Sequence, residues 1–326
     1  MPEAVIDSHQ HFWDPATGSC GWMTEDYEPI RRVFTPDDLR PELVANGVDG
    51  TVLVQTWASL EETREFLGIA ATNDFVSGVV GWADLTNPDI DETLANFKSR
   101  SDGRYLVGIR HLVHNEPDPN WLLTEDVRRG LAAVSRAGLA YDLLLRTREI
   151  PAGLRTVEDF PNMRFVIDHI AKPNIRDGAF QPWATLMHQF EPHRVHVWCK
   201  LSGMVTEANW KTWQPQDLKP YVQEVLKIFG PNRCMFGSDW PVCAWSQAAM
   251  AASKLSLSPA STASRKSSAG QFLAMQRSRR IDYRTFTRRL TPEGGNSNEC
   301  ECRWSLELPS DVGSHRFRGK RPWQSL

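Results

Sequence analysis

The amino-acid sequence predicts an α/β protein folded as a (β/α)8 barrel, or TIM barrel, and three observations support this prediction. Eight short apolar segments alternate with helix-like segments and start near residues 5, 48, 76, 106, 140, 164, 196 and 234. Strict alternation of strands and helices is typical of a parallel sheet. Eight such units within about 250 residues match the size of this barrel, whose active site lies at the carboxyl ends of its strands. Ionisable side chains gather at these ends in five of the segments.

An open, doubly wound sheet is the alternative fold, because it also alternates strands with helices. That fold usually carries a Gly-rich phosphate-binding turn after its first strand, and no such turn is present here. The barrel is therefore preferred. Its strands are expected, in order, at 5–13, 48–55, 75–85, 106–113, 140–145, 164–170, 196–203 and 234–240.

Capping residues mark the helices between these strands. Thr35 followed by Pro36 and two acidic residues is typical of a helix start, and Gly47 of a helix end. Ser59 and Glu62 have the spacing of a capping box. The other helices are expected to begin at Asn87-Pro88, to run from Thr124 to Gly138, and to cover 217–229.

The charge of the chain is divided unevenly between two parts. Residues 1–250 contain 23 Lys and Arg against 34 Asp and Glu, whereas residues 251–326 contain 14 against 6. We expect 1–250 to form the barrel domain. The segment 251–326 is rich in Ser and Arg and lacks a steady apolar period, so we expect a disordered basic tail.

The basic tail stands where a barrel needs its eighth helix, which is therefore predicted to be incomplete or replaced. Exposing about 500 Å² of apolar surface costs on the order of 12 kcal/mol, so we expect lower stability than in a relative with a closing helix. Two origins stay open. The tail is either the product of a frameshift, splicing or a gene-model error, or a genuine extension that binds acidic partners.

Composition also limits the compartment and the partners. No apolar run of about 18 residues occurs, so no transmembrane helix is expected. The N-terminus lacks the features of a secretory signal, and the six cysteines lack CxxC spacing. A cytoplasmic protein with no membrane or nucleic-acid partner is predicted. The sequence does not indicate an oligomeric state.

Two histidines separated by one residue, His9 and His11, end the first strand. Side chains two residues apart on a strand share a face, so both rings project together, with Asp7 deeper on the same face. Such a pair can hold a metal ion or polarise a carbonyl group. By itself it is a weak signal, but other strand ends carry ionisable or polar groups, namely Arg110, His169, Lys200, Ser202 and Asp239.

Six motifs between residues 5 and about 245 strengthen this interpretation: Ile6-Asp7-Ser8-His9-Gln10-His11-Phe12-Trp13, Gly108-Ile109-Arg110-His111, Asn115-Glu116-Pro117-Asp118, Asp168-His169-Ile170-Ala171-Lys172-Pro173, Cys199-Lys200-Leu201-Ser202-Gly203 and Met235-Phe236-Gly237-Ser238-Asp239-Trp240-Pro241. With them the chain resembles the lactonase branch of the amidohydrolase superfamily. That branch includes L-fuconolactonases, L-rhamnonolactonases and 2-pyrone-4,6-dicarboxylate lactonase-like enzymes. The resemblance implies a barrel that hydrolyses a sugar 1,4- or 1,5-lactone to the aldonic acid.

The resemblance also implies catalytic positions, and the chemistry of ester hydrolysis requires the same groups. A base must activate water, an electrophile must polarise the carbonyl oxygen, and the leaving alkoxide needs a proton. We assign Asp239 as the base that activates water. The three histidines His9, His11 and His169 are assigned to polarise the carbonyl group of the lactone. Substrate contacts are expected from Arg110, Lys200, Trp13 and Trp82.

A metal ion is the open point of this assignment. His9, His11, His169 and Asp239 form a plausible zinc set. Binuclear amidohydrolases also use a histidine on strand five, and 141–145 contains none. We expect no obligatory cofactor, with a single divalent ion such as zinc as the alternative.

Two other functions were weighed against the lactonase. The first is a metal-dependent decarboxylase or amide hydrolase of the same superfamily. The second is a catalytically inactive splice or frameshift product whose basic tail mediates binding.

Overall fold

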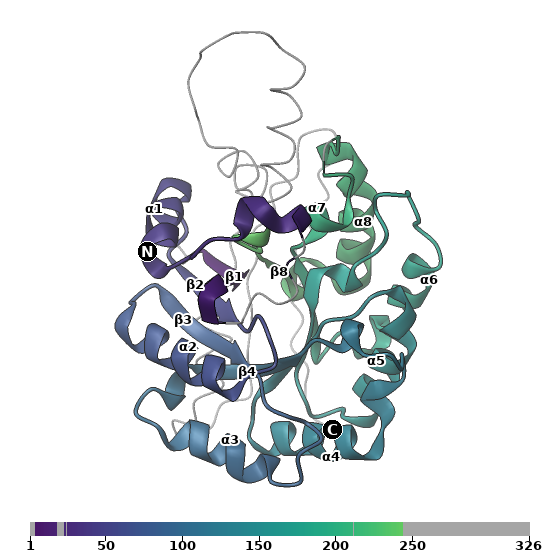
Figure 1. Cartoon of the computed structure of the whole chain (residues 1–326). Coiled ribbons are helices and arrows are strands. Elements are labelled where there is room, and N and C mark those ends of the chain that lie inside the picture. The colour runs from purple at the N-terminus through teal and green to yellow at the C-terminus, as the bar shows by residue number, and fades with distance from the viewer. Residues whose placement is uncertain (1–3, 18–22, 24, 211, 244–326) are drawn as a thin grey trace, which may run out of the picture.

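Eight parallel strands form a single sheet in the computed structural model, which describes residues 4–17, 23, 25–210 and 212–243. Each strand pairs with the next along the chain, so the sheet curls into the predicted barrel (Figure 1). The strands are β1 (Ile6–Gln10), β2 (Gly50–Val54), β3 (Val76–Gly81), β4 (Leu106–His111), β5 (Ala140–Leu143), β6 (Phe165–Ile167), β7 (Val197–Leu201) and β8 (Cys234–Phe236). The tail 251–326 and the helix expected after β8 lie outside the described residues.

The barrel closes between β1 and the segment that follows β8. The amide of Asp239 donates to the carbonyl of His9, and the amide of His11 donates to the carbonyl of Trp240, each at 2.8 Å. The carboxylate of Asp7 accepts hydrogen bonds from the amide and the hydroxyl of Ser238. Burial raises the pKa of Asp7 to about 6. Asp7 therefore stabilises the contact between β1 and the segment after β8 and does not line the site. This contact places His9 next to Asp239.

Helices surround the strands on the outside of the barrel (Figure 1). They are α1 (Pro36–Asn46), α2 (Leu60–Thr72), α3 (Ile90–Ser99), α4 (Glu125–Arg136), α5 (Ile150–Asp159), α6 (Trp183–His188), α7 (Met204–Glu207) and α8 (Pro215–Phe229). Among the described residues, none of the helices has the length and apolar character needed to cross a bilayer.

The start of α2 differs from the predicted capping box. Ser59 caps it as expected, because its hydroxyl accepts from the amides of Glu61 and Glu62 at 3.1 Å. The carboxylate of Glu62, however, turns to the end of β2 and accepts from the amide of Thr56 at 3.0 Å. Glu62 thus links the helix to a loop beside the cavity, and its burial raises the pKa of the carboxyl to about 7.

Apolar side chains form two cores. The larger core packs the outer faces of the strands against the helices. The smaller core consists almost entirely of strand residues, including Ile6, Val54, Val166 and Met235, and it fills part of the barrel interior. The rest of that interior carries charged side chains, which lead to the site.

Candidate active site

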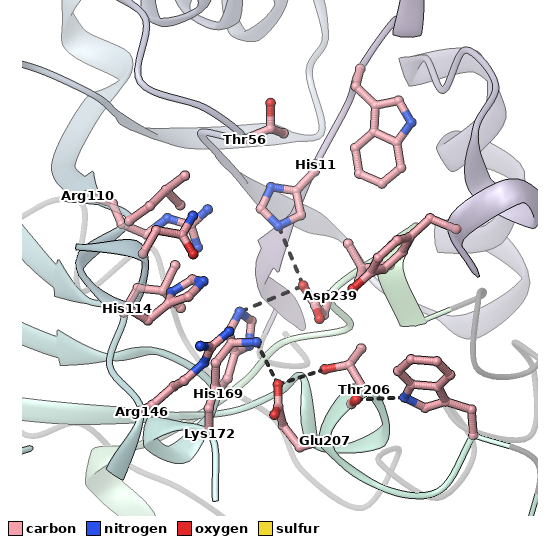
Figure 2. A pocket seen from close by; sticks show the side chains of 17 residues that line it. His11, Thr56, Arg110, His114, Arg146, His169, Lys172, Thr206, Glu207 and Asp239 are labelled. Carbon is pink, nitrogen blue, oxygen red and sulfur yellow. Dashed lines mark hydrogen bonds and ion pairs between the residues drawn. The ribbon is translucent and has the colours of Figure 1, made fainter. Parts of the chain in front are cut away.

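A cavity of about 410 Å³ opens at the carboxyl ends of the strands (Figure 2). Its lining residues come from the ends of, or the loops after, β1, β2, β4, β5, β6, β7 and β8. This is the end at which a (β/α)8 barrel carries its functional groups. Five of the residues singled out in the sequence line it: His11, Trp13, Arg110, His169 and Asp239.

Three of the residues predicted to be catalytic or to bind substrate do not line this cavity. His9 and Lys200 are fully buried inside the barrel. Trp82 donates from its indole nitrogen to Nδ1 of His111 at 3.0 Å. The structure therefore places Lys200 and Trp82 away from the cavity surface, whereas His9 stays within reach of Asp239 from below.

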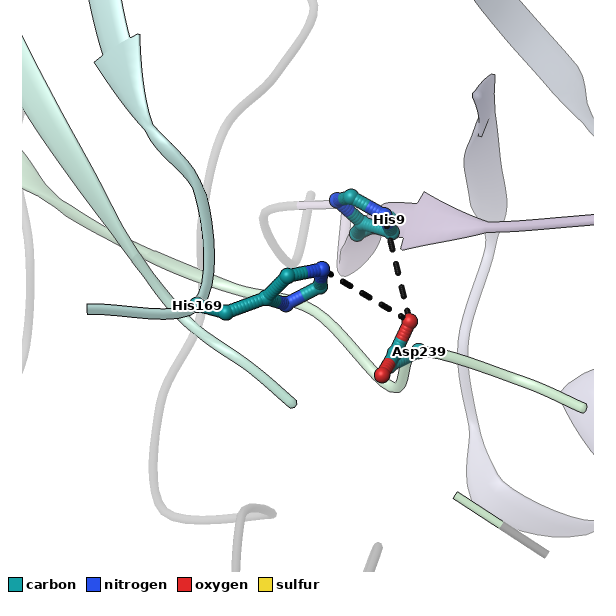
Figure 3. Close-up of side chains that lie close together, drawn as sticks. All are labelled: His9, His169 and Asp239. Atoms are coloured by element: carbon teal, nitrogen blue, oxygen red, sulfur yellow. Dashed lines mark ion pairs between the residues drawn. The ribbon is translucent and has the colours of Figure 1, made fainter. Parts of the chain in front are cut away.

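Asp239 lies where the three histidines converge: Figure 3 shows it with His9 and His169, and Figure 2 shows it with His11 and His169. Its Oδ1 atom is 3.5 Å from Nε2 of His11 and 3.9 Å from Nε2 of both His9 and His169. Burial alone would raise the pKa of Asp239, but the electrostatic attraction of its carboxylate to His169 and its interactions with His11 outweigh burial and hold the pKa below its ordinary value. The carboxylate is therefore ionised at neutral pH and can accept a proton.

His9 and His11 face each other through their Nε2 atoms, which are 3.1 Å apart. Nδ1 of His11 lies 2.7 Å from the carbonyl oxygen of Val54, and a carbonyl accepts only from a nitrogen that carries hydrogen. A neutral His11 then has its lone pair at Nε2. Two ring nitrogens this close need one proton or one cation between them.

His169 lies on an unusual left-handed backbone turn, which places its side chain in the cavity lining. The four residues 169–172 all have positive φ, from 45° to 57°, although none is glycine. Left-handed backbone is costly for such residues and is concentrated at functional sites. Ser202 then lies 2.8 Å from Nδ1 of His169 through its hydroxyl. Asp239 also has a positive φ of 58°, so two reactive side chains stand on strained backbone.

Charged residues at the floor of the cavity and below it surround His9. Arg110 and Lys200 approach opposite nitrogens of its ring, each at 3.2 Å. Asp168 and Asp142 balance the two cations. Burial and the charge of Lys200 hold the pKa of His9 well below its usual range, so this ring is neutral.

Sequence reasoning missed several of these residues. Asp142 and Asp168 were not assigned to the site, nor were the cavity residues His114, Arg146 and Lys172. The sequence does offer a reason to single out Asp142, since it is the one charged residue in the strand segment 140–145. It offers no reason to single out Arg146, because an arginine after a strand is common on the surface of any barrel.

Three side chains could hold a metal ion. His9, His169 and Asp239 each offer one atom, and these atoms lie within 4.8 Å of one another. Two imidazole nitrogens and one carboxylate oxygen suit a divalent ion such as zinc. The set is smaller than the sequence suggested, because His11 is not part of it.

Comparison with known proteins identifies relatives of this chain. The sequence profile described as amidohydrolase matches residues 6–255. An L-fucono-1,5-lactonase of Burkholderia ambifaria is 38% identical over 239 residues, which cover 73% of this chain and 80% of that enzyme. An L-fucono-1,5-lactonase of Burkholderia multivorans is 34% identical over 248 residues, covering 73% and 82%.

Solved structures agree with this family match. A crystal structure of an amidohydrolase from Burkholderia multivorans with bound zinc has a TM-score of 0.70 and 30% identity. The match covers 83% of this chain and 95% of that one. The resemblance seen in the sequence motifs is thereby confirmed.

Proposed function

Because this chain is a member of the amidohydrolase family, we propose that it opens the ring ester of a sugar lactone, an aldono-1,4- or 1,5-lactone, to the aldonic acid. One observation carries the proposal. An ionised carboxylate, that of Asp239, lines the cavity among three imidazole rings. The names of the two Burkholderia relatives support a lactone as the substrate class.

Asp239 acts as the base in this reaction. It takes a proton from a water molecule, and the water oxygen attacks the carbonyl carbon of the lactone. The tetrahedral intermediate then collapses, and the bond between that carbon and the ring oxygen breaks. Asp239 returns the proton to the departing ring oxygen, which leaves a hydroxyl group and a carboxylic acid.

The developing negative charge on the carbonyl oxygen is stabilised by donors at the cavity floor. Where the Ser202 hydroxyl donates to Nδ1 of His169, the Nε2 of that ring carries hydrogen and donates towards the oxygen. Arg110 adds a fixed positive charge at the same end of the cavity. His11 and His9 share one proton and complete the cluster from β1.

The cavity walls suit a polyhydroxylated ring (Figure 2). Polar and cationic side chains from the β4, β5 and β6 loops line one wall, among them His114, Arg146 and Lys172. The aromatic residues Trp13 and Trp210 also line the cavity. The hydroxyl groups of a sugar can form hydrogen bonds with the polar and cationic side chains. The C–H face of the sugar can pack on the aromatic rings.

We propose that this hydrolysis needs no metal ion. A divalent ion would be held by His9, His169 and Asp239 and would supply Lewis-acid polarisation of the carbonyl group. Nη1 of Arg110 and Nζ of Lys200 each lie 3.2 Å from a ring nitrogen of His9. A ring nitrogen that accepts a hydrogen bond from either group has no lone pair left for a metal ion.

A metal-dependent amide hydrolase or decarboxylase is the second candidate function. The His9, His169 and Asp239 group and the zinc-bound relative favour it. It requires activity that disappears on chelation and returns with zinc, which is the opposite of the metal-independent lactonase.

Acid release from a panel of sugar 1,4- and 1,5-lactones tests the proposal. The full chain is assayed with a pH indicator, with and without chelator. We expect turnover of at least one lactone and the same rate after chelation. A chain that melts cooperatively but turns over none of the lactones contradicts the lactonase. Loss of the rate on chelation contradicts metal independence.

A further inference from the structure

Four charged side chains form a buried ion cluster inside the barrel: Arg110 on β4, Asp142 on β5, Asp168 after β6 and Lys200 on β7. Nζ of Lys200 lies 2.5 Å from Oδ2 of Asp142 and 2.9 Å from Oδ1 of Asp168. Nη1 of Arg110 lies 3.0 Å from Oδ2 of Asp168. Two cations and two carboxylates compensate one another, which lets them stay charged away from water.

His9 connects this cluster to the cavity. Its Nδ1 lies 3.2 Å from Nζ of Lys200 and 3.4 Å from Oδ1 of Asp168. Its Nε2 is 3.1 Å from Nε2 of His11 and 3.9 Å from Oδ1 of Asp239. The Nδ1 side of the ring therefore faces Lys200 and Asp168 of the ion cluster. The Nε2 side faces His11 and Asp239 in the cavity, together with Arg110.

We propose that Lys200 is a positioning residue for the reaction, whose ammonium group, anchored by Asp142 and Asp168, holds the ring of His9 and through it the placement of His11 and Asp239. This role rests on the proposed lactonase function. Lys200 is fully buried and is not among the cavity residues, so it cannot contact a substrate there. The ammonium group of Lys200 carries three hydrogens. Two of them are donated to Asp142 and Asp168, and the third points to His9.

A purely structural role for Lys200 makes a different prediction. Buried ion pairs add little to stability compared with well-packed apolar residues of similar size. If the pair only filled space, an apolar replacement would leave both folding and turnover intact. If Lys200 positions His9, the same replacement leaves folding intact and slows the chemical step, with little change in substrate binding.

The double variant Lys200→Met/Asp142→Leu separates these roles. It removes one cation and one carboxylate together, and the Arg110–Asp168 pair stays balanced in the interior. The matched control is Arg128→Met/Asp159→Leu, which removes an ion pair of 2.6 Å between the outer helices α4 and α5. Each protein is assayed for kcat, KM and thermal melting on a lactone that the wild type hydrolyses.

We expect both double variants to melt cooperatively and only Lys200→Met/Asp142→Leu to lose kcat. Misplacement of a catalytic group by about 1 Å lowers rates about 10²-fold, so we expect a fall of that order for Lys200→Met/Asp142→Leu. KM stays within about threefold of wild type, and the control keeps its kcat. A kcat within about threefold of wild type in the Lys200 variant overturns the proposal.

A second variant decides the matter if the first does not melt cooperatively. Asp142→Asn keeps the shape of the side chain and removes one anchor of Lys200. In the described part of the structure, Asp142 makes no hydrogen bond or ion pair with His9. We expect kcat to fall at least about fivefold at unchanged KM, and an unchanged kcat contradicts the positioning role. A wild type without turnover of any lactone instead refutes the proposed function, on which this role depends.

Discussion

At the scale of single residues, Asp239 is the group on which the proposed chemistry depends. Asp239→Asn keeps the size of the side chain, and asparagine tolerates positive φ well, so the fold should persist. Loss of a general base typically lowers kcat by 10²- to 10⁴-fold, and we expect a fall of about that size. Steady-state kinetics with circular dichroism checks this.

A suitable control for that variant is Asp91→Asn, which changes an exposed carboxylate paired with Arg136 on the outer surface. It should leave kcat unchanged. Rates close to wild type in Asp239→Asn would show that another group activates the water.

Gly203 makes room for His169. A Cβ atom at this position would lie 2.4 Å from Nδ1 of His169, and the residue also has a φ of +61°. Gly203→Ala should therefore displace the His169 ring and lower kcat at least about tenfold, since small displacements of catalytic groups are costly. Kinetics and thermal melts of the variant test this.

Gly138→Ala is the matched control, because Gly138 has a φ of +72° but no atom within 4 Å of an added Cβ. Both variants carry the left-handed backbone penalty of about 1–2 kcal/mol. Only the Gly203 variant should lose activity. Equal activity of the two would mean that His169 has freedom to move without loss of rate.

At the scale of elements, Glu62 ties α2 to the end of β2 and makes this junction sensitive to pH. Burial raises the pKa of Glu62 to about 7, whereas an unperturbed glutamate has a pKa of 4.5. Between these two values the folded state binds more protons than the unfolded chain, so this group lowers the free energy of unfolding as the pH rises.

Glu62→Gln removes this pH dependence while an amide oxygen can still accept from the amide of Thr56. The free energy of unfolding of the variant, relative to wild type, should increase by about 3 kcal/mol between pH 4.5 and pH 7.5. Urea unfolding at several pH values measures it. Glu65→Gln, an exposed change on the same helix, should show no such trend. A constant difference between wild type and Glu62→Gln would mean that Glu62 is ionised in the folded protein.

Elements were predictable from the sequence where the signal is local. Ser59 and Gly47 cap helices as expected, because capping uses neighbouring backbone groups. His9 and His11 could be placed at a strand end from the alternation of strand faces. The left-handed turn at 169–172 could not be predicted from the sequence, because none of its residues is a glycine, the residue that usually indicates positive φ. The Lys200–Asp142 contact joins β7 with β5, and no local pattern encodes it.

At the scale of the whole molecule, the eight strands of the described part of the chain lie before residue 244, and the family match ends at residue 255. The segment beyond is basic and poor in periodic apolar residues. A segment of that composition contributes little to a hydrophobic core. We therefore propose that residues 1–250 contain the catalytic domain and that the tail contributes little to its stability.

Deletion of residues 258–326 tests this division. The truncated chain should keep the kcat of the full chain, and its melting temperature should stay within about 2 °C, which corresponds to about 1 kcal/mol for a domain of this size. Replacing the basic segment with the closing helix of a relative should instead raise the melting temperature, because an amphipathic helix packed on the outside of the barrel buries further apolar surface. A truncated chain that melts several degrees lower would show that the basic segment packs on the barrel and takes the place of that helix.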